Sequence, residues 1–394
     1  MIRCLRSFYL YGGLILEKYF SVHSDRIEIL RSRNMTIPNG SQEKELLRKY
    51  NYYNLVNAYK DPFLYQGSST TEKYKNGTRL SELEALLIFD ANLRLIFLKE
   101  ILRVEEMIKN QIVQSFYNYH LNGNPDNSDI EKSSLHRDSE YLRRKYYDLS
   151  TSYSVHNIDS YGIVSTTVHR TRPNGKSSTL DKHSAYDNYV STVYRTIGQQ
   201  RKNKNDSIKS YSEQHGYIPM WILMNVLTFG NVSHLFTLQK KDVQLHMIKS
   251  LGINNFPHLS DDLDIINASR VLQILSLFRN TCAHNERFYL SKIRVPIDDS
   301  FMSFGQKLPH AVNPASRRRL NSSQRSKRLN ARSGIYSLIF SLSLFMDKQQ
   351  LNDLIKGIRF EFKSLEDKLS TINIEEIERN MGMNFNWYEL IKTK

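Results

Sequence analysis

One nine-residue stretch carries side chains that could act together on a phosphodiester. It contains Arg279, Asn280, His284 and Arg287, and an apolar helical run leads directly into it. An arginine can stabilise negative charge on phosphoryl oxygens, and a histidine can transfer a proton near neutral pH. These residue types therefore indicate a site that binds a phosphodiester and moves a proton.

The spacing of this motif is weak evidence by itself, and its context strengthens it. Among the twelve histidines, His284 alone has an arginine five to seven residues before it. Chance would nevertheless supply about two or three such pairs in this composition. On a helix, Asn280 and His284 share a face, and Arg279 is long enough to reach round to it. The alternative interpretation is a capping or buried histidine at a helix bend.

The helix that presents the motif has a recognisable start. Ser260 is followed by three acidic residues within four positions, which is typical of a helix N-terminus. Apolar residues then recur on one face as far as Phe278. The pattern predicts a packed helix that delivers Arg279 and the residues after it.

A longer helix is predicted from Ser81 to about Tyr119. Ser81 and Glu84 fit a capping box, in which each side chain bonds a backbone N–H at the helix start. Apolar residues follow at three- and four-residue steps. The charged residues of this helix include Asp90, Arg94, Glu100, Arg103, Glu105 and Glu106. They indicate an ion pair between helices or, alternatively, a carboxylate that orients a catalytic side chain.

The remaining segments predict an all-α fold. Helices are expected at 41–59, from about 219 to 239, and within 335–346, 351–369 and 384–391, with Asn231 or Ser233 capping the helix after Phe229. The polar, tyrosine-rich segment 122–209 predicts helical patches and a short hairpin between Val155 and Val168. The expected division is an N-terminal arm (1–40), a helical part with the long helix (41–120), a polar basic insertion or lid (121–211), a core carrying the motif (212–296), a basic loop (297–334) and C-terminal helices (335–394).

Composition narrows the class of partner. The 394-residue chain has a formal net charge of +15 and a pI near 9.5, which favours a polyanionic partner. The alternative is a basic chain that is simply soluble. Cys4 and Cys282 are its two cysteines, so neither a disulfide framework nor a cysteine metal site is expected. No run of the sequence reaches the length of a membrane span, so we expect a cytoplasmic location and no membrane partner.

The densest basic patch lies after the motif and contains no acidic residue. We expect RNA binding by this patch together with the last arginine of the motif. The predicted RNA-binding residues are Arg287, Arg317, Arg318, Arg319, Arg325, Lys327, Arg328 and Arg332.

The motif also carries a family resemblance. Residues 279–287 resemble the RNxCAHxxR signature of the AbiD/AbiF-type abortive-infection (Abi-like) family, which is part of the HEPN superfamily. Other family elements are matched in the expected order. They are Tyr50-Asn51-Tyr52-Tyr53 with Leu55 and Tyr59, Phe89-Asp90-Ala91-Asn92-Leu93-Arg94, Ile218-Pro219-Met220-Trp221, and Leu227-Thr228-Phe229-Gly230-Asn231-Val232-Ser233.

The resemblance implies an all-helical HEPN bundle, a phage-defence or toxin role and RNA as substrate. HEPN nucleases cleave RNA without a metal, so no cofactor is expected. The catalytic set would be Arg279, Asn280 and His284, with two copies of the motif meeting in a homodimer. Some relatives associate with a small noncoding RNA.

Two other classes stay open. One is a non-catalytic RNA-binding protein that holds a structured noncoding RNA, with Arg279 and His284 as contacts. The other is a helical protein-interaction module with a structural histidine.

Overall fold

The computed structural model describes residues 21–38, 42–65, 72–123, 134–149, 157–158, 164–165, 170–171, 177–178, 182–203, 206–251, 260–284, 286–293, 296–298, 301–302, 321–383 and 386–392. Residues 1–20 and 39–40 of the predicted N-terminal arm therefore lie outside the described residues. The chain forms two compact units, residues 1–88 with 365–373, and residues 89–364 with 374–394. The division falls inside the long helix α3 (Leu80–Asn118), at a point that the composition does not mark.

The first unit is built from short helices. It contains α1 (His23–Ser32), α2 (Glu43–Lys49), the π-helix η1 (Tyr53–Asn57), the 3₁₀-helix η2 (Asp61–Phe63) and the first turns of α3. The single helix predicted at 41–59 is wrong. Tyr50 has extended backbone (φ −114°, ψ 144°), so α2 ends there and η1 forms a separate turn.

The predicted capping box of the long helix is also wrong. Ser81 lies within the first turn of α3, and Glu82 makes the capping contact instead of Glu84. The Glu82 carboxylate accepts hydrogen bonds from the N–H of Arg79 at 3.1 Å and from the N–H groups of residues 370 and 371 at 2.7 and 2.8 Å. The length of α3 and its buried apolar stripe are as predicted.

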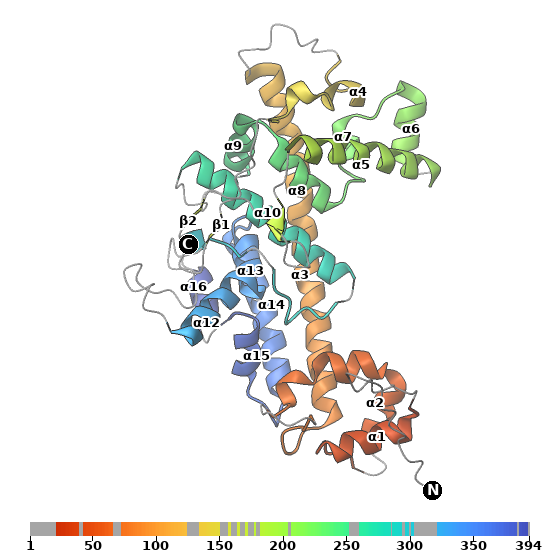
Figure 1. Ribbon diagram of the computed structural model, residues 1–394, viewed down its shortest axis with the longest axis vertical. Coiled ribbons are helices and arrows are strands. Elements are labelled where there is room, and N and C mark those ends of the chain that lie inside the picture. Colours follow the sequence, from red (N-terminus) through yellow and green to blue (C-terminus); the bar gives the residue numbers. More distant parts are fainter. Residues whose placement is uncertain are drawn as a thin grey trace, which may run out of the picture. The chain divides into compact units, whose positions relative to one another are not determined.

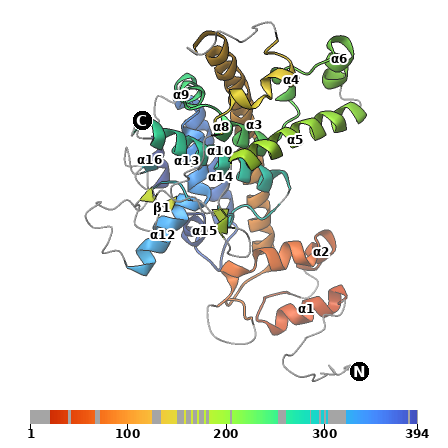
Figure 2. The same cartoon turned by 45° about the horizontal axis from the view of Figure 1, so that its top comes forward.

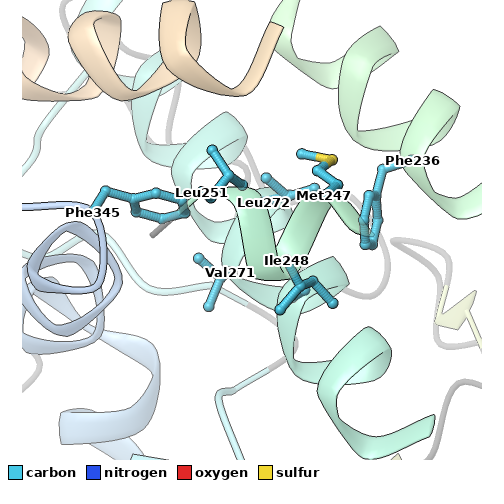
Figure 3. Close-up of a pocket in the computed structure, with 8 residues that line it drawn as sticks. Phe236, Met247, Ile248, Leu251, Val271, Leu272 and Phe345 are labelled. Atoms are coloured by element: carbon cyan, nitrogen blue, oxygen red, sulfur yellow. The ribbon is translucent and has the colours of Figure 1, made fainter. Parts of the chain in front are cut away.

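The core of the second unit surrounds α10 (Asp261–Ala283). This helix packs against α8 (Phe229–Leu238), α9 (Lys241–Ser250) and α13 (Ile335–Ser343), which Figure 1 shows around it. All residues of α13 are buried, so this helix lies wholly within the core beside α10. A small apolar pocket remains beside α10 (Figure 3). Its lining includes Phe236, Met247, Ile248, Val271, Leu272 and Phe345.

Helix starts in this unit follow local capping chemistry. The Ser260 hydroxyl accepts a hydrogen bond from the Leu263 N–H, which confirms the predicted start of α10. Thr228 caps α8, so the prediction of Asn231 or Ser233 as its cap is wrong and both residues lie inside the helix.

The described residues between α3 and α8 form several short helices and one longer one. They are η3 (Tyr119–Gly123), α4 (Asp138–Tyr141), η5 (Arg144–Tyr146), α5 (Lys182–Lys202), α6 (Asp206–His215) and α7 (Met220–Leu223). Figure 2 labels α4, α5 and α6. The predicted hairpin is confirmed, because β1 (Asn157–Ile158) pairs antiparallel with β2 (Val164–Ser165). A second pair, β3 (Arg170–Thr171) with β4 (Ser177–Ser178), was not expected.

The range predicted as a basic loop contains a helix. Residues 322–333 form α12 (Ser322–Ser333), and the side chains of Asn321 and Gln324 make a reciprocal capping box with the backbone at its start. The C-terminal helices are α14 (Lys348–Glu366), α15 (Ile374–Asn380) and α16 (Trp387–Lys392). Within the described residues, no helix has both the length and the apolar content needed to cross a membrane.

Candidate active site

The motif lies where α10 ends. His284 is the C-cap of the helix, and its N–H donates to the carbonyl oxygen of Asn280 at 2.9 Å. Both side chains are exposed, and the side chain of Arg279 is 31% exposed. Asn280 and His284 therefore both contribute accessible surface at the helix end.

The opposite side of the motif is anchored in the core. Phe278 and Cys282 are buried, and the rings of Phe278 and Phe97 lie 5.9 and 5.2 Å from the ring of Phe288. Burial raises the pKa of the Cys282 thiol to about 12, so this thiol stays protonated and unreactive at neutral pH. The same helix turn thus presents polar groups outward and apolar groups inward.

A buried carboxylate on α3 meets the first residue of the motif. Glu105 is 5% exposed, and its Oε2 lies 3.6 Å from Arg279 Nε. Its other oxygen, Oε1, lies 2.7 Å from Lys109 Nζ. Glu105 therefore joins two cations, one of which is the candidate catalytic arginine.

A second buried carboxylate on α3 holds the chain just after the motif. Asp90 is fully buried, and its Oδ1 accepts hydrogen bonds from the N–H groups of Phe288 at 3.0 Å and Tyr289 at 2.6 Å. Arg94 Nη1 lies 2.5 Å from Asp90 Oδ2 and donates to the Glu286 carbonyl oxygen at 2.9 Å. The Asp90–Arg94 pair thus fixes the backbone over residues 286–289.

These contacts bear on the two interpretations that the sequence left open for α3, an ion pair between helices and a carboxylate that orients a catalytic side chain. Asp90 and Arg94 do form an ion pair, but both residues belong to α3. The two side chains also bond backbone groups of residues 286, 288 and 289, which are 192 to 199 residues away in the chain. Sequence patterns could not reveal this arrangement, because any residue can supply a backbone N–H. The sequence does contain one local indication of this contact, because Asp90 and Arg94 lie four residues apart within an apolar stripe.

The predicted RNA-binding residues separate into three groups. Arg287, Arg325 and Lys327 are exposed, the last two on α12. Arg332 is 3% exposed and donates from Nε to the Ile297 carbonyl oxygen at 2.7 Å, so it belongs to the interior and not to an exposed basic surface. Arg317, Arg318 and Arg319 lie outside the described residues, as does the side chain of Arg328.

The motif presents an imidazole, a guanidinium and an amide at the end of α10. His284 and Asn280 face solvent together, and Arg279 lies next to Asn280 with its Nε turned toward Glu105. Among the described residues, no group of three or more His, Cys, Asp or Glu side chains is arranged to hold a metal ion.

The fold and the motif place this chain among all-α proteins that carry an arginine, an asparagine and a histidine at the end of a helix. The family model of Abi-like proteins matches residues 45–290, which is more than half of the chain and includes the motif. The chain belongs to the Abi-like protein family. This membership implies a role in abortive infection, a form of phage defence. Neither a curated protein nor a solved structure matches the chain.

Proposed function

We propose that this Abi-like protein is a metal-independent endoribonuclease of the HEPN type that acts on RNA during abortive infection. The observation that carries the proposal is the exposed pair Asn280 and His284 beside Arg279, at the end of a helix whose opposite face is buried. Solvent access at this pair lets a polynucleotide reach the three side chains, while the buried face of α10 keeps them in place.

In the proposed reaction, His284 acts as general base on a ribose 2′-OH. The oxygen then attacks the adjacent phosphorus, and the 5′-oxygen of the next nucleotide leaves with a proton. Arg279 stabilises the charge that develops on the phosphoryl oxygens, and Asn280 orients His284 or the phosphate. The products are a 2′,3′-cyclic phosphate and a 5′-OH end.

The proton for the leaving oxygen has to come from a second group. Each chain carries one copy of the motif. A homodimer that brings two His284 side chains to one site would supply both a base and an acid. Exposed Arg287, Arg325 and Lys327 would hold the RNA backbone, with an affinity that falls steeply as salt rises.

The proposal is tested by incubating the purified protein with single-stranded RNA in the presence of EDTA. Wild-type protein is expected to cleave, and His284→Ala to lose about 10²–10⁴-fold in rate, the usual effect of removing a catalytic acid or base. His215→Ala is the matched control, because His215 is exposed on α6 outside the motif.

Two results would contradict the nuclease proposal. Cleavage that disappears in EDTA, or that persists in His284→Ala, would assign the activity to other groups. Wild-type protein that binds RNA tightly without cleaving it would instead support a non-catalytic protein that holds a noncoding RNA. Sequencing of RNA that co-purifies with the protein would identify that ligand.

A further inference from the structure

Glu105 has an unusual position for an acidic residue. It is 5% exposed on α3, in contact with Arg279 at 3.6 Å and with Lys109 at 2.7 Å. A buried carboxylate is strongly disfavoured unless cations or hydrogen bonds compensate its charge. Glu105 nevertheless lies beside Arg279, the arginine that the proposed function assigns to phosphate binding. This position calls for an explanation.

The two cations beside Glu105 are not equivalent. The Lys109 contact is short enough for a charge-assisted hydrogen bond, whereas Arg279 Nε is too far from Oε2 for one. Lys109 can thus compensate the carboxylate even if Arg279 moves. Arg279 is held by charge attraction at its Nε, and its guanidinium can shift toward a phosphate without leaving Glu105 unpaired.

We propose that Glu105 is a positioning residue for Arg279. Its carboxylate attracts the Nε side of the guanidinium and so turns the terminal nitrogens toward the exposed face of the motif. This inference rests on the proposed function, since it assigns Arg279 to the phosphoryl group. Glu105 itself touches neither RNA nor the reacting atoms.

Positioning matters because an arginine side chain has many rotamers. A donor that is already oriented toward the developing charge stabilises the transition state without reorganising at the moment of reaction. A guanidinium released from Glu105 would still attract a phosphate, but it would do so from several geometries. Removing Glu105 should therefore affect the chemical step more than RNA binding.

The first test is the kinetics of Glu105→Gln in the full-length protein. The rate constant kcat is expected to fall about 10–100-fold, as for other residues that orient a functional group. KM should change by a smaller factor than kcat, because a guanidinium that is no longer oriented by Glu105 still attracts the phosphate. Glu106→Gln is the matched control, since it removes the same charge from the next, exposed position of α3.

The second test is a double-mutant cycle with Arg279. If Glu105 acts through Arg279, Glu105→Gln should change the affinity for labelled single-stranded RNA when Arg279 is present and should have no further effect in Arg279→Ala. Affinities are measured in the His284→Ala background, so that cleavage does not interfere, and the binding stoichiometry reports the folded fraction. A residue with a merely structural role would give the same factor in both backgrounds.

The outcomes separate this inference from the proposed function. If wild-type protein does not cleave RNA, the nuclease proposal fails while the binding cycle still decides the role of Glu105. A kcat within about twofold of wild type, or a cycle without coupling, would overturn the inference. If Glu105→Gln does not fold, Glu105→Asp replaces it, because the shorter side chain keeps the charge for Lys109 but withdraws it from Arg279.

Discussion

At the scale of single residues, Asp90 is a charged side chain that is fully buried next to the motif. Its carboxylate joins α3 to backbone groups 198 and 199 residues away. Arg94 neutralises its charge and also bonds the Glu286 carbonyl oxygen. The backbone conformation over residues 286–289 therefore depends on the Asp90 carboxylate and the Arg94 guanidinium.

We expect Asp90→Asn to destabilise the protein strongly. Asparagine keeps an acceptor oxygen, but it removes the charge that pairs with Arg94 and places an NH₂ group among N–H donors. Loss of one partner of a buried pair typically costs ~3–5 kcal/mol in the free energy of unfolding, which urea denaturation measures. Asp353→Asn is the control, because Asp353 is exposed on α14. A loss for Asp90→Asn no greater than that of the control would show that the Asp90 contacts contribute little.

At the scale of elements, α3 holds the motif at two points. Glu105 meets Arg279, and Asp90 meets Phe288 and Tyr289. The two acids are fifteen residues apart (105 − 90), which corresponds to about 22 Å along a helix. A continuous helix from 279 to 288 would cover only about 14 Å. Anchors at this spacing therefore favour a chain that leaves the helix at His284, as the structure shows.

The same elements show what the sequence could predict. The long helix and the start of α10 at Ser260 follow from periodicity and capping chemistry, whereas the exposure of His284 was left open against a capping or buried histidine. Other features depend on contacts between distant segments, and a local pattern does not contain them. Arg332 looks like part of a basic run until α12 packs and buries it, and the cap at Glu82 depends on residues 370 and 371.

The π-helix η3, which follows α3 directly, contains a buried histidine whose charge state affects stability. His120 is 1% exposed, and its ring lies 4.5 Å from the ring of Phe116 and 5.0 Å from that of Tyr146. Burial, and next the positive charge of Lys240, lower the pKa of His120 to about 4. The histidine therefore stays neutral in the folded protein at pH values where it would be charged in the unfolded chain.

We expect the protein to lose stability between about pH 6.5 and pH 4 because of this residue. In this range the unfolded chain binds a proton at position 120 that the folded protein does not, so acidification favours unfolding. Going from pH 7 to pH 5 should lower the free energy of unfolding by about 2 kcal/mol through His120. Urea denaturation of His120→Gln should show a smaller loss than wild type, whereas His215→Gln should match wild type. Equal pH dependence in all three proteins would contradict this assignment.

At the scale of the whole molecule, the charge and the motif point to the same kind of ligand. The net charge of +15 favours a polyanion, and the motif contains two arginines, Arg279 and Arg287, with His284 between them. The match to Abi-like proteins ends at residue 290, directly after the motif and the Asp90 contacts. The family pattern therefore contains both the exposed set and the part of α3 that holds it.

The proposed sharing of one site by two chains is tested with a mixed dimer. Wild-type and His284→Ala chains carrying different tags are co-expressed, and the dimer with one of each is isolated by purification on both tags. If the two motifs form a single site, with one His284 as base and the other as acid, the mixed dimer should cleave RNA on the order of 10²–10⁴-fold more slowly than a doubly tagged wild-type dimer. Two independent sites would instead leave about half of the wild-type rate, because one intact motif remains. A mixed dimer with about half of the wild-type rate would show that each chain carries a complete site of its own. Full cleavage by wild-type protein at a concentration where sedimentation shows only monomer would show the same.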